Sequence, residues 1–183
     1  MINNKGTVYW ITGLSGAGKT TIGNMFSTRL RKESSSVIYL DGDVLREVFD
    51  KEYSHTPDER RALAMQYARL CRILADQGTN IVCSTISMFH EIHEWNRNNI
   101  ERYVEIYLKV PMDVLITRDQ KSLYSRALNA KVANVIGIDV DAEEPKFPDI
   151  TLVNDGKSTP DSIVSDLWSQ LLKSNLLRLD GYD

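Results

Sequence analysis

Cysteine, proline and long apolar runs are scarce in this sequence. Two of its 183 residues are cysteine, Cys71 and Cys83, and five are proline. The two cysteines are too far apart for a Cys-x-x-Cys redox or zinc pair and lie in apolar segments, so we expect buried free thiols in a reducing compartment. No apolar run approaches the roughly 18 residues of a membrane span, and the first six residues lack the apolar core of a signal peptide. We therefore expect a cytoplasmic protein with no membrane partner.

A marked excess of charge is also absent. The chain has 22 lysine and arginine residues against 25 aspartate and glutamate residues, a formal net charge of −3. This balance produces no field that attracts a polyanion, so we expect no nucleic-acid partner. A chain of this length can bury about 70% of the surface that its unfolded form exposes. We expect a single domain over residues 1–183.

Five short β-rich segments alternate with stretches of helical length. The first, residues 7–12, is apolar at nearly every position, which is typical of a buried parallel strand. The others are residues 37–40, 80–85, 103–110 and 150–153. Parallel strands need crossover connections, which are usually helices, so the pattern predicts an α/β fold.

Two helices have recognisable ends in the sequence. The spacing of apolar residues predicts a helix over residues 58–77, with Thr56 and Glu59 forming a capping box and Gly78 ending it. A similar opening predicts a last amphipathic helix over residues 160–177. Residues 121–148 differ, because a basic stretch with a possible short helix is followed by an acidic turn. This segment is either a mobile excursion over the sheet edge or an ordinary surface connection.

The first strand leads into a complete Gly-x-x-x-x-Gly-Lys-Ser/Thr motif at residues 13–20. Its glycines let successive N–H groups point inward, and the following helix adds the positive end of its dipole. Lys19 is expected to reach the β- and γ-phosphates, and the Thr20 hydroxyl to bind magnesium. We predict a site for ATP and Mg²⁺ formed by Gly13, Ser15, Gly16, Ala17, Gly18, Lys19, Thr20 and Thr21.

Two carboxylates follow the second strand, in Leu40-Asp41-Gly42-Asp43. They lie at the carboxyl edge of the sheet, where α/β proteins bind ligands. An acceptor hydroxyl needs a carboxylate to orient it or take its proton, and magnesium needs an anionic partner; Asp43 suits either task. For Asp41, capping the next helix is as well supported as a role in the site. Arg46 lies one helical turn after Asp43, so their side chains share a face of that helix. The Asn-Lys-x-Asp motif of switch GTPases is absent, which disfavours that class.

Taken in order, these segments resemble the adenylylsulfate kinase family from Thr7 to about Asn154. Besides the phosphate loop, the matching segments are Leu40–Asp43 with Arg46, Arg60, Ala75–Gly78, Ile86–Ser87, Arg118–Tyr124, and Gly137–Asp139 with Glu144–Pro145. The resemblance implies a P-loop NTPase fold with a five-stranded parallel sheet flanked by helices, and a lid over about residues 121–148. It also implies transfer of the ATP γ-phosphate to the 3′-hydroxyl of a small-molecule nucleotide acceptor.

The same resemblance assigns roles to individual residues. It implies that Lys19, Asp43 and Lys121 are catalytic and that Thr20 and Asp43 hold the metal. It also implies a set of substrate-binding positions, at two of which, 55 and 135, this chain departs from the family. These residues are Asp43, Arg46, His55, Arg60, Ile86, Ser87, Lys121 and Val135.

The sequence departs from the family at positions that hold adenylylsulfate. Leu63 stands where the family has asparagine, and His55 and Val135 stand where it has phenylalanine. Aromatic stacking is worth roughly 1 to 3 kcal/mol per base, so we expect weaker adenine binding. Residues 85–89 look more like a branch of the family that phosphorylates cytidine diphosphoramidate for surface polysaccharides. We expect that acceptor, with adenylylsulfate as an alternative and a non-catalytic ATP-binding regulator as an alternative of another class.

Two further expectations concern histidine and assembly. His90 and His93 are separated by three positions instead of the four of a His-Glu-x-x-His zinc site, so a helix surface or a substrate-edge His90 is favoured over a metal site. Because two-fold dimers are the commonest assemblies, we expect a homodimer.

Overall fold

A single five-stranded sheet organises the part of the chain that the structure describes. The computed structural model describes residues 5–34, 36–49, 56–119, 122–128, 136–138 and 142–177. The strands are β1 (Val8–Thr12), β2 (Val37–Asp41), β3 (Asn80–Ser84), β4 (Tyr103–Lys109) and β5 (Ile150–Val153). They pair in the order β2-β3-β1-β4-β5, and every pair is parallel. The predicted α/β fold with a five-stranded parallel sheet is confirmed.

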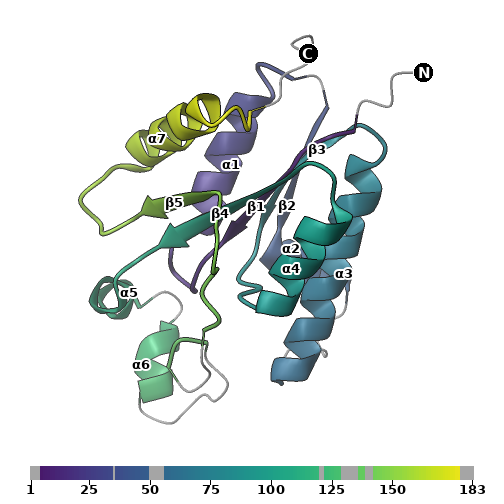
Figure 1. The fold of residues 1–183 in the computed structure, drawn as a ribbon. Coiled ribbons are helices and arrows are strands. Elements are labelled where there is room, and N and C mark those ends of the chain that lie inside the picture. Colours follow the sequence, from purple (N-terminus) through teal and green to yellow (C-terminus); the bar gives the residue numbers. More distant parts are fainter. Residues whose placement is uncertain are drawn as a thin grey trace.

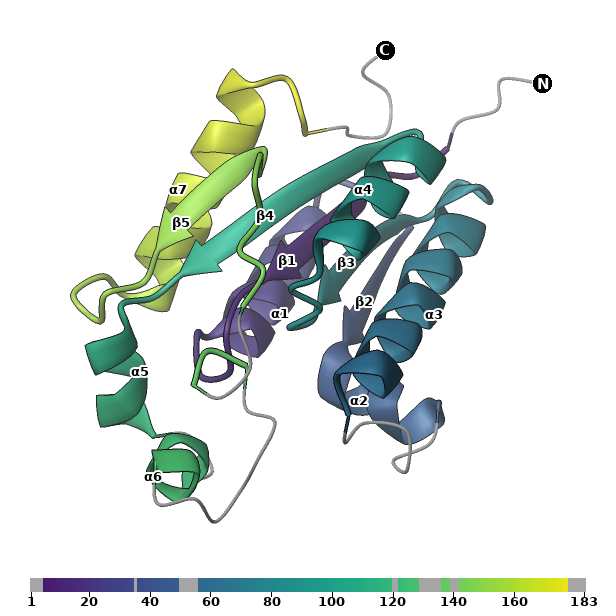
Figure 2. The ribbon, with the colours of Figure 1, turned by 60° about the horizontal axis from the view of Figure 1, so that its bottom comes forward.

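Helices cover both faces of this sheet. They are α1 (Lys19–Leu30), α2 (Gly42–Val48), α3 (Pro57–Ala75), α4 (His90–Asn99), α5 (Met112–Arg118), α6 (Leu123–Leu128) and α7 (Pro160–Lys173). Helices α1 and α7 pack on one face, and α3 and α4 pack on the other (Figure 1; Figure 2). Helices α5 and α6 lie beyond the carboxyl end of β4 (Figure 1). None of the described helices has the length and apolar character needed to cross a membrane.

The central strand β1 supplies both halves of the core. Tyr9 and Ile11 belong to the cluster that packs against α1 and α7, whereas Val8 and Trp10 belong to the cluster on the α3 and α4 side. All four side chains are fully buried. Because successive strand residues point to opposite faces, an almost entirely apolar strand is one that is covered on both sides. The sequence prediction for residues 7–12 is confirmed, with the strand beginning one residue later.

The predicted capping box of α3 is present. The Thr56 hydroxyl accepts the Glu59 N–H at 3.3 Å, and the Glu59 carboxylate accepts the Thr56 N–H at 2.9 Å. These bonds satisfy N–H groups that have no partner within the helix. The helix ends at Ala75, two residues before the predicted end, and Gly78 follows with a positive φ of 86°.

Helix α7 is shorter than the sequence predicts. It ends at Lys173 and not at Leu177. Asn175 takes a left-handed conformation with a φ of 54°, and the Leu176 N–H bonds back to the Leu171 carbonyl at 2.9 Å. This reversal returns Leu177 to the core, where it is buried. The predicted helix is too long because it is based on the spacing of apolar residues, which continues through this turn.

The predicted lid is described in part. Helix α6 confirms the short helix expected within residues 121–148. Near the end of this segment, the His90 N–H donates to the Glu143 carboxylate at 2.6 Å, and Lys109 pairs with Glu144 at 3.3 Å. The described portion after residue 141 therefore packs on α4 and β4.

Candidate active site

The phosphate loop occupies the turn between β1 and α1. Gly18 precedes the first residue of α1 and has φ 98° and ψ 14°, a left-handed conformation that glycine adopts without a Cβ clash. Helix α1 begins at Lys19, so its first N–H groups lie at the end of the loop. A helix N-terminus preceded by such a loop favours bound phosphate.

Residues from α5, from α6 and from the end of β5 support this loop. The Tyr124 hydroxyl donates to the Ser15 carbonyl at 2.7 Å, and the Asn154 amide donates to the Ala17 carbonyl at 2.8 Å. Arg118 in turn donates to the Asn154 side-chain oxygen at 3.0 Å. These bonds satisfy loop carbonyls, which would repel an anion if they faced it.

Lys19 lies within the cavity beside two carboxylates. Its ammonium donates to the Leu14 carbonyl at 2.8 Å. Burial lowers the pKa of Lys19 to about 8, although the nearby Asp43 and Asp41 carboxylates oppose that shift. A buried ammonium with a depressed pKa gains from any additional negative charge brought close to it.

Asp41 combines the two tasks that the sequence left open for it. It is the N-cap of α2, because its Oδ1 accepts the Asp43 N–H at 2.9 Å. Its Oδ2 accepts the Thr20 hydroxyl at 2.7 Å and the Tyr39 hydroxyl at 3.0 Å. The Asp41 carboxylate therefore caps α2 and also bonds Thr20 at the end of the phosphate loop. This bond connects the end of β2 to the start of α1 at the site.

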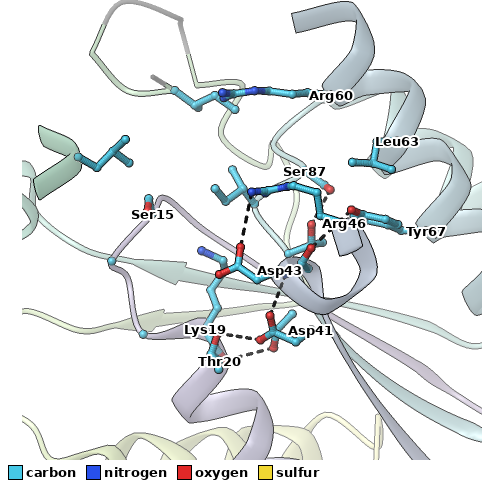
Figure 3. A pocket seen from close by; sticks show the side chains of 18 of the residues that line it. Ser15, Lys19, Thr20, Asp41, Asp43, Arg46, Arg60, Leu63, Tyr67 and Ser87 are labelled. Atoms are coloured by element: carbon cyan, nitrogen blue, oxygen red, sulfur yellow. Dashed lines mark hydrogen bonds and ion pairs between the residues drawn. The ribbon is translucent and has the colours of Figure 1, made fainter. Parts of the chain in front are cut away.

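Asp43 and Arg46 lie on one face of α2, as their spacing predicts. The Arg46 Nη1 and Asp43 Oδ1 atoms are 3.6 Å apart, and the side chains are 41% and 61% exposed. The buried Arg46 Nε has no hydrogen-bond partner among the described residues. Figure 3 shows this pair beside Lys19, with Arg60 reaching the same space from α3.

These groups line one cavity of about 460 Å³ (Figure 3). The predicted site residues that line it are Ser15, Gly16, Gly18, Lys19, Thr20, Thr21, Asp43, Arg46, Arg60, Ile86 and Ser87. Gly13 and Ala17 belong to the loop but are buried and are not among the lining residues. His55, Lys121 and Val135 lie outside the described residues.

An apolar wall is the part of the cavity that sequence reasoning largely missed. Leu63, Tyr67, Phe89 and Ile136 line it in addition to Ile86. Tyr67 reads as a core residue in the helical pattern, and it is indeed 3% exposed, yet its ring also borders the cavity. Its position one turn after Leu63 is the signal that could have identified it.

Comparisons with known proteins agree with this geometry. The profile of the adenylylsulphate kinase family matches residues 5–153. A cytidine diphosphoramidate kinase of Campylobacter jejuni is 41% identical over 145 residues, which are 79% of this chain and 85% of that protein. An adenylyl-sulfate kinase of Chloroflexus aurantiacus is 36% identical over 158 residues, or 86% and 85% of the two chains.

A solved structure shows the same arrangement of elements. The APS kinase CysC of Mycobacterium tuberculosis, solved in complex with AMPPNP and APS, superposes with a TM-score of 0.82 at 26% identity. The match covers 92% of this chain and 98% of that chain. With a phosphate loop, a facing carboxylate and a family match over most of its length, this chain belongs to the adenylylsulfate kinase family of P-loop kinases.

Proposed function

We propose that this kinase transfers the γ-phosphate of ATP to the 3′-hydroxyl of a nucleotide, with cytidine diphosphoramidate as the preferred acceptor. One observation carries the proposal: the phosphate loop and the Asp43–Arg46 pair face a single cavity of about 460 Å³. This volume is in the range of small-molecule sites. The arrangement suits in-line transfer between a bound donor and a bound acceptor, without a covalent enzyme intermediate.

Lys19 and Thr20 are proposed to hold the donor. The Lys19 ammonium would exchange the Leu14 carbonyl for phosphate oxygens, where its charge offsets the charge that develops on transfer. Thr20, Asp41 and Asp43 offer only oxygen ligands, which Mg²⁺ prefers. The Thr20 Oγ1 and Asp41 Oδ2 atoms are 2.7 Å apart. Bound Mg²⁺ supplies charge neutralisation at the β- and γ-phosphates.

Asp43 and the arginines are proposed to act on the acceptor. The Asp43 carboxylate would orient the 3′-hydroxyl and take its proton, and Arg46 and Arg60 would hold the diphosphate-like group. The buried Nε–H group of Arg46 has no hydrogen-bond acceptor among the described residues, and an anionic ligand would supply one. Lys121 is proposed as a further cation near the phosphates, from the family resemblance.

The preference for the cytidine acceptor is supported from two directions. Leu63 lines the cavity at a position where the family has an amide, so that polar contact to the acceptor is missing. The Campylobacter jejuni protein named for cytidine diphosphoramidate is 41% identical to this chain, compared with 36% for the adenylyl-sulfate kinase of Chloroflexus aurantiacus. From the resemblance to the branch with that acceptor, we propose a role in surface polysaccharide synthesis.

A competition between acceptors tests this preference. Purified protein with ATP and Mg²⁺ is offered cytidine diphosphoramidate or adenylylsulfate, and 3′-phosphorylated product is measured. We expect kcat/KM to be at least about tenfold higher for the cytidine compound, a factor within the range of one lost stacking contact. Faster turnover of adenylylsulfate would assign the enzyme to that acceptor instead.

Asp43→Asn separates a kinase from an ATP-binding regulator. We expect kcat to fall by about 100-fold or more, because a positioned general base contributes about that much, whereas the affinity for ATP measured without Mg²⁺ changes by less than about threefold. Rates come from the coupled assay and affinities from calorimetry. Asp161→Asn, an exposed carboxylate at the start of α7, is the control. Full activity in Asp43→Asn would remove the assigned role.

We also propose a cytoplasmic location, which suits an ATP-dependent enzyme with two buried free cysteines. The homodimer stays a prediction, which sedimentation of the purified protein measures.

A further inference from the structure

A buried histidine and a buried glutamate meet beside the acceptor side of the cavity. His93 on α4 is 5% exposed, and Glu105 on β4 is 1% exposed. The His93 Nδ1 and Glu105 Oε1 atoms lie 3.2 Å apart, and neither has another hydrogen-bond partner among the described residues. The helix-surface position suggested by the His90 and His93 spacing is therefore wrong for His93, which faces the sheet.

The other ring nitrogen of His93 fixes where its proton is. Nε2 lies 3.1 Å from the Ser87 carbonyl oxygen, which can only accept a hydrogen bond. Nε2 must therefore carry a hydrogen, and a neutral ring then presents the lone pair of Nδ1 to Glu105. Two acceptors at 3.2 Å repel each other unless a proton lies between them. The geometry requires one such proton, on Glu105 or on the His93 Nδ1.

Ser87 connects this pair to the cavity. It lines the cavity and has a φ of 29°, in the left-handed region that costs a serine conformational energy. Its carbonyl accepts the Phe89 N–H at 3.0 Å as well as the His93 ring, and its hydroxyl lies 2.7 Å from that of Thr85. We call residues 85–89 the acceptor turn. The His93 bond is one of the contacts that hold this turn in its strained shape.

Charged neighbours surround the pair from several elements. Arg97, on the same helix as His93, contacts the Glu105 Oε2 at 3.0 Å and Asp149 at 3.2 Å. Asp149 also accepts the Glu105 N–H at 2.7 Å. Within the described ranges, His90, Tyr103 and Glu143 also act on the pair.

Burial is the main cause of both pKa shifts in the pair. It lowers the pKa of His93 to about 4, and it raises the pKa of Glu105 to about 7 in spite of Arg97. Between about pH 4 and about pH 7 the pair therefore holds two hydrogens, one on the His93 Nε2 and one between Nδ1 and Glu105, and above about pH 7 it holds only one.

We propose that His93 and Glu105 are positioning residues that share one proton and thereby hold the Ser87 carbonyl, and with it the acceptor turn, in the shape that binds the acceptor. When Glu105 loses its proton, the neutral His93 ring changes tautomer: its one hydrogen moves from Nε2 to Nδ1, where it bonds to the Glu105 carboxylate. Nε2 then has no hydrogen to donate to the Ser87 carbonyl. The acceptor KM then rises while the ATP KM does not. This inference rests on the proposed function, because it takes the nucleotide acceptor to be the molecule that binds the acceptor turn.

Glu105→Gln is the sharpest test. A glutamine amide can donate to the His93 Nδ1 and accept from Arg97, so it imitates the protonated glutamate at every pH. We expect the wild-type acceptor KM to rise up to about tenfold between pH 6 and pH 8, because a group with a pKa of about 7 is only about one-tenth protonated at pH 8. In Glu105→Gln it should stay within about twofold. An equal rise in both proteins overturns the proposal.

His93→Leu removes the bond to Ser87. We expect its acceptor KM to be about tenfold above that of the wild type at pH 6, the factor for one lost hydrogen bond, with the ATP KM within about twofold. Glu94→Gln, at a carboxylate on the same helix that is 69% exposed, should change neither KM. Equal changes in both KM values of His93→Leu would show a general loss of structure and contradict the positioning role.

A spectroscopic readout needs neither turnover nor the His93→Leu variant. The chain has three histidines, so nitrogen-15 spectra of the imidazoles are simple to assign. We expect His93 to carry its proton on Nε2 at pH 6 and on Nδ1 at pH 8.5; an Nε2 without hydrogen at pH 6 overturns the proposal. Wild-type protein that phosphorylates no nucleotide would contradict the proposed function, whereas the spectrum would still decide how the pair holds its proton.

Discussion

At the scale of single residues, Lys19 shows how the fold prepares a site for a charged ligand. The chain buries its ammonium next to a backbone carbonyl, and this burial lowers the pKa of Lys19 to about 8. The triphosphate of ATP would bring negative charge to the ammonium and raise that pKa again. We therefore expect donor binding to be coupled to proton uptake at alkaline pH.

This coupling predicts a pH dependence of ATP affinity. Below pH 8 Lys19 is already charged, so affinity should change little; above pH 8 binding must take up a proton, and the affinity should fall by up to about tenfold per pH unit. Calorimetry at pH 7 and pH 9, in buffers with different ionisation enthalpies, measures the uptake. It should be near zero at pH 7 and approach one proton at pH 9.

Lys19→Arg is the matched control for this measurement. A guanidinium keeps its charge over the whole range, so the remaining ATP binding should take up no proton. Equal uptake in both proteins at pH 9 would assign the proton to another group.

At the scale of elements, the capping box of Thr56 and Glu59 stabilises the first turn of α3. This helix carries Arg60, Leu63 and Tyr67 to the cavity, and the Thr56 hydroxyl satisfies the Glu59 N–H at its first turn. Thr56→Ala should lower the free energy of unfolding by about 1 kcal/mol, because the N–H loses its partner. For a chain of this size the melting temperature should fall by roughly 2 to 4 °C.

Urea and thermal unfolding measure the effect of Thr56→Ala. Thr117→Ala, in which the lost hydroxyl bonds to the Asp113 carbonyl within α5, removes no cap and should change stability by less than about 0.5 kcal/mol. Identical stability of the wild type and Thr56→Ala would show that the capping box contributes nothing measurable.

The described part of residues 121–148 contacts both sides of the site. Tyr124 on α6 reaches the Ser15 carbonyl, and Glu143 accepts the His90 N–H at the start of α4. The sequence offered a mobile excursion or an ordinary connection for this region. The described contacts show that part of it supports the phosphate loop, which composition could not reveal because the partners are 109 residues apart.

At the scale of the whole molecule, donor binding should stabilise the fold. A ligand at 100 times its Kd adds about 2.7 kcal/mol to the free energy of unfolding, which for this size corresponds to a rise of roughly 5 to 10 °C in melting temperature. Differential scanning fluorimetry with ATP and Mg²⁺ measures the shift. Lys19→Met should lose most of it at the same ATP concentration, and an unshifted wild type at saturating ATP would contradict the donor site.

Much of the architecture was predictable from the sequence. Strands β1 to β5 begin and end within one residue of the predicted bounds, because each is a short segment rich in β-branched and aromatic residues between helical stretches. The phosphate loop and the Asp43–Arg46 pair were also predictable, since each is a matter of local spacing.

The local amino-acid order by itself determined which segments become strands and helices, where α3 begins, and which loop is shaped for phosphate, since these depend on interactions over a few residues. Only the tertiary structure decided that His93 meets Glu105, that Tyr124 and Asn154 brace the loop, and that Asp41 reaches Thr20. The physical reason is distance along the chain. Such contacts exist only after crossover helices have packed on a twisted sheet, and no local pattern encodes that packing.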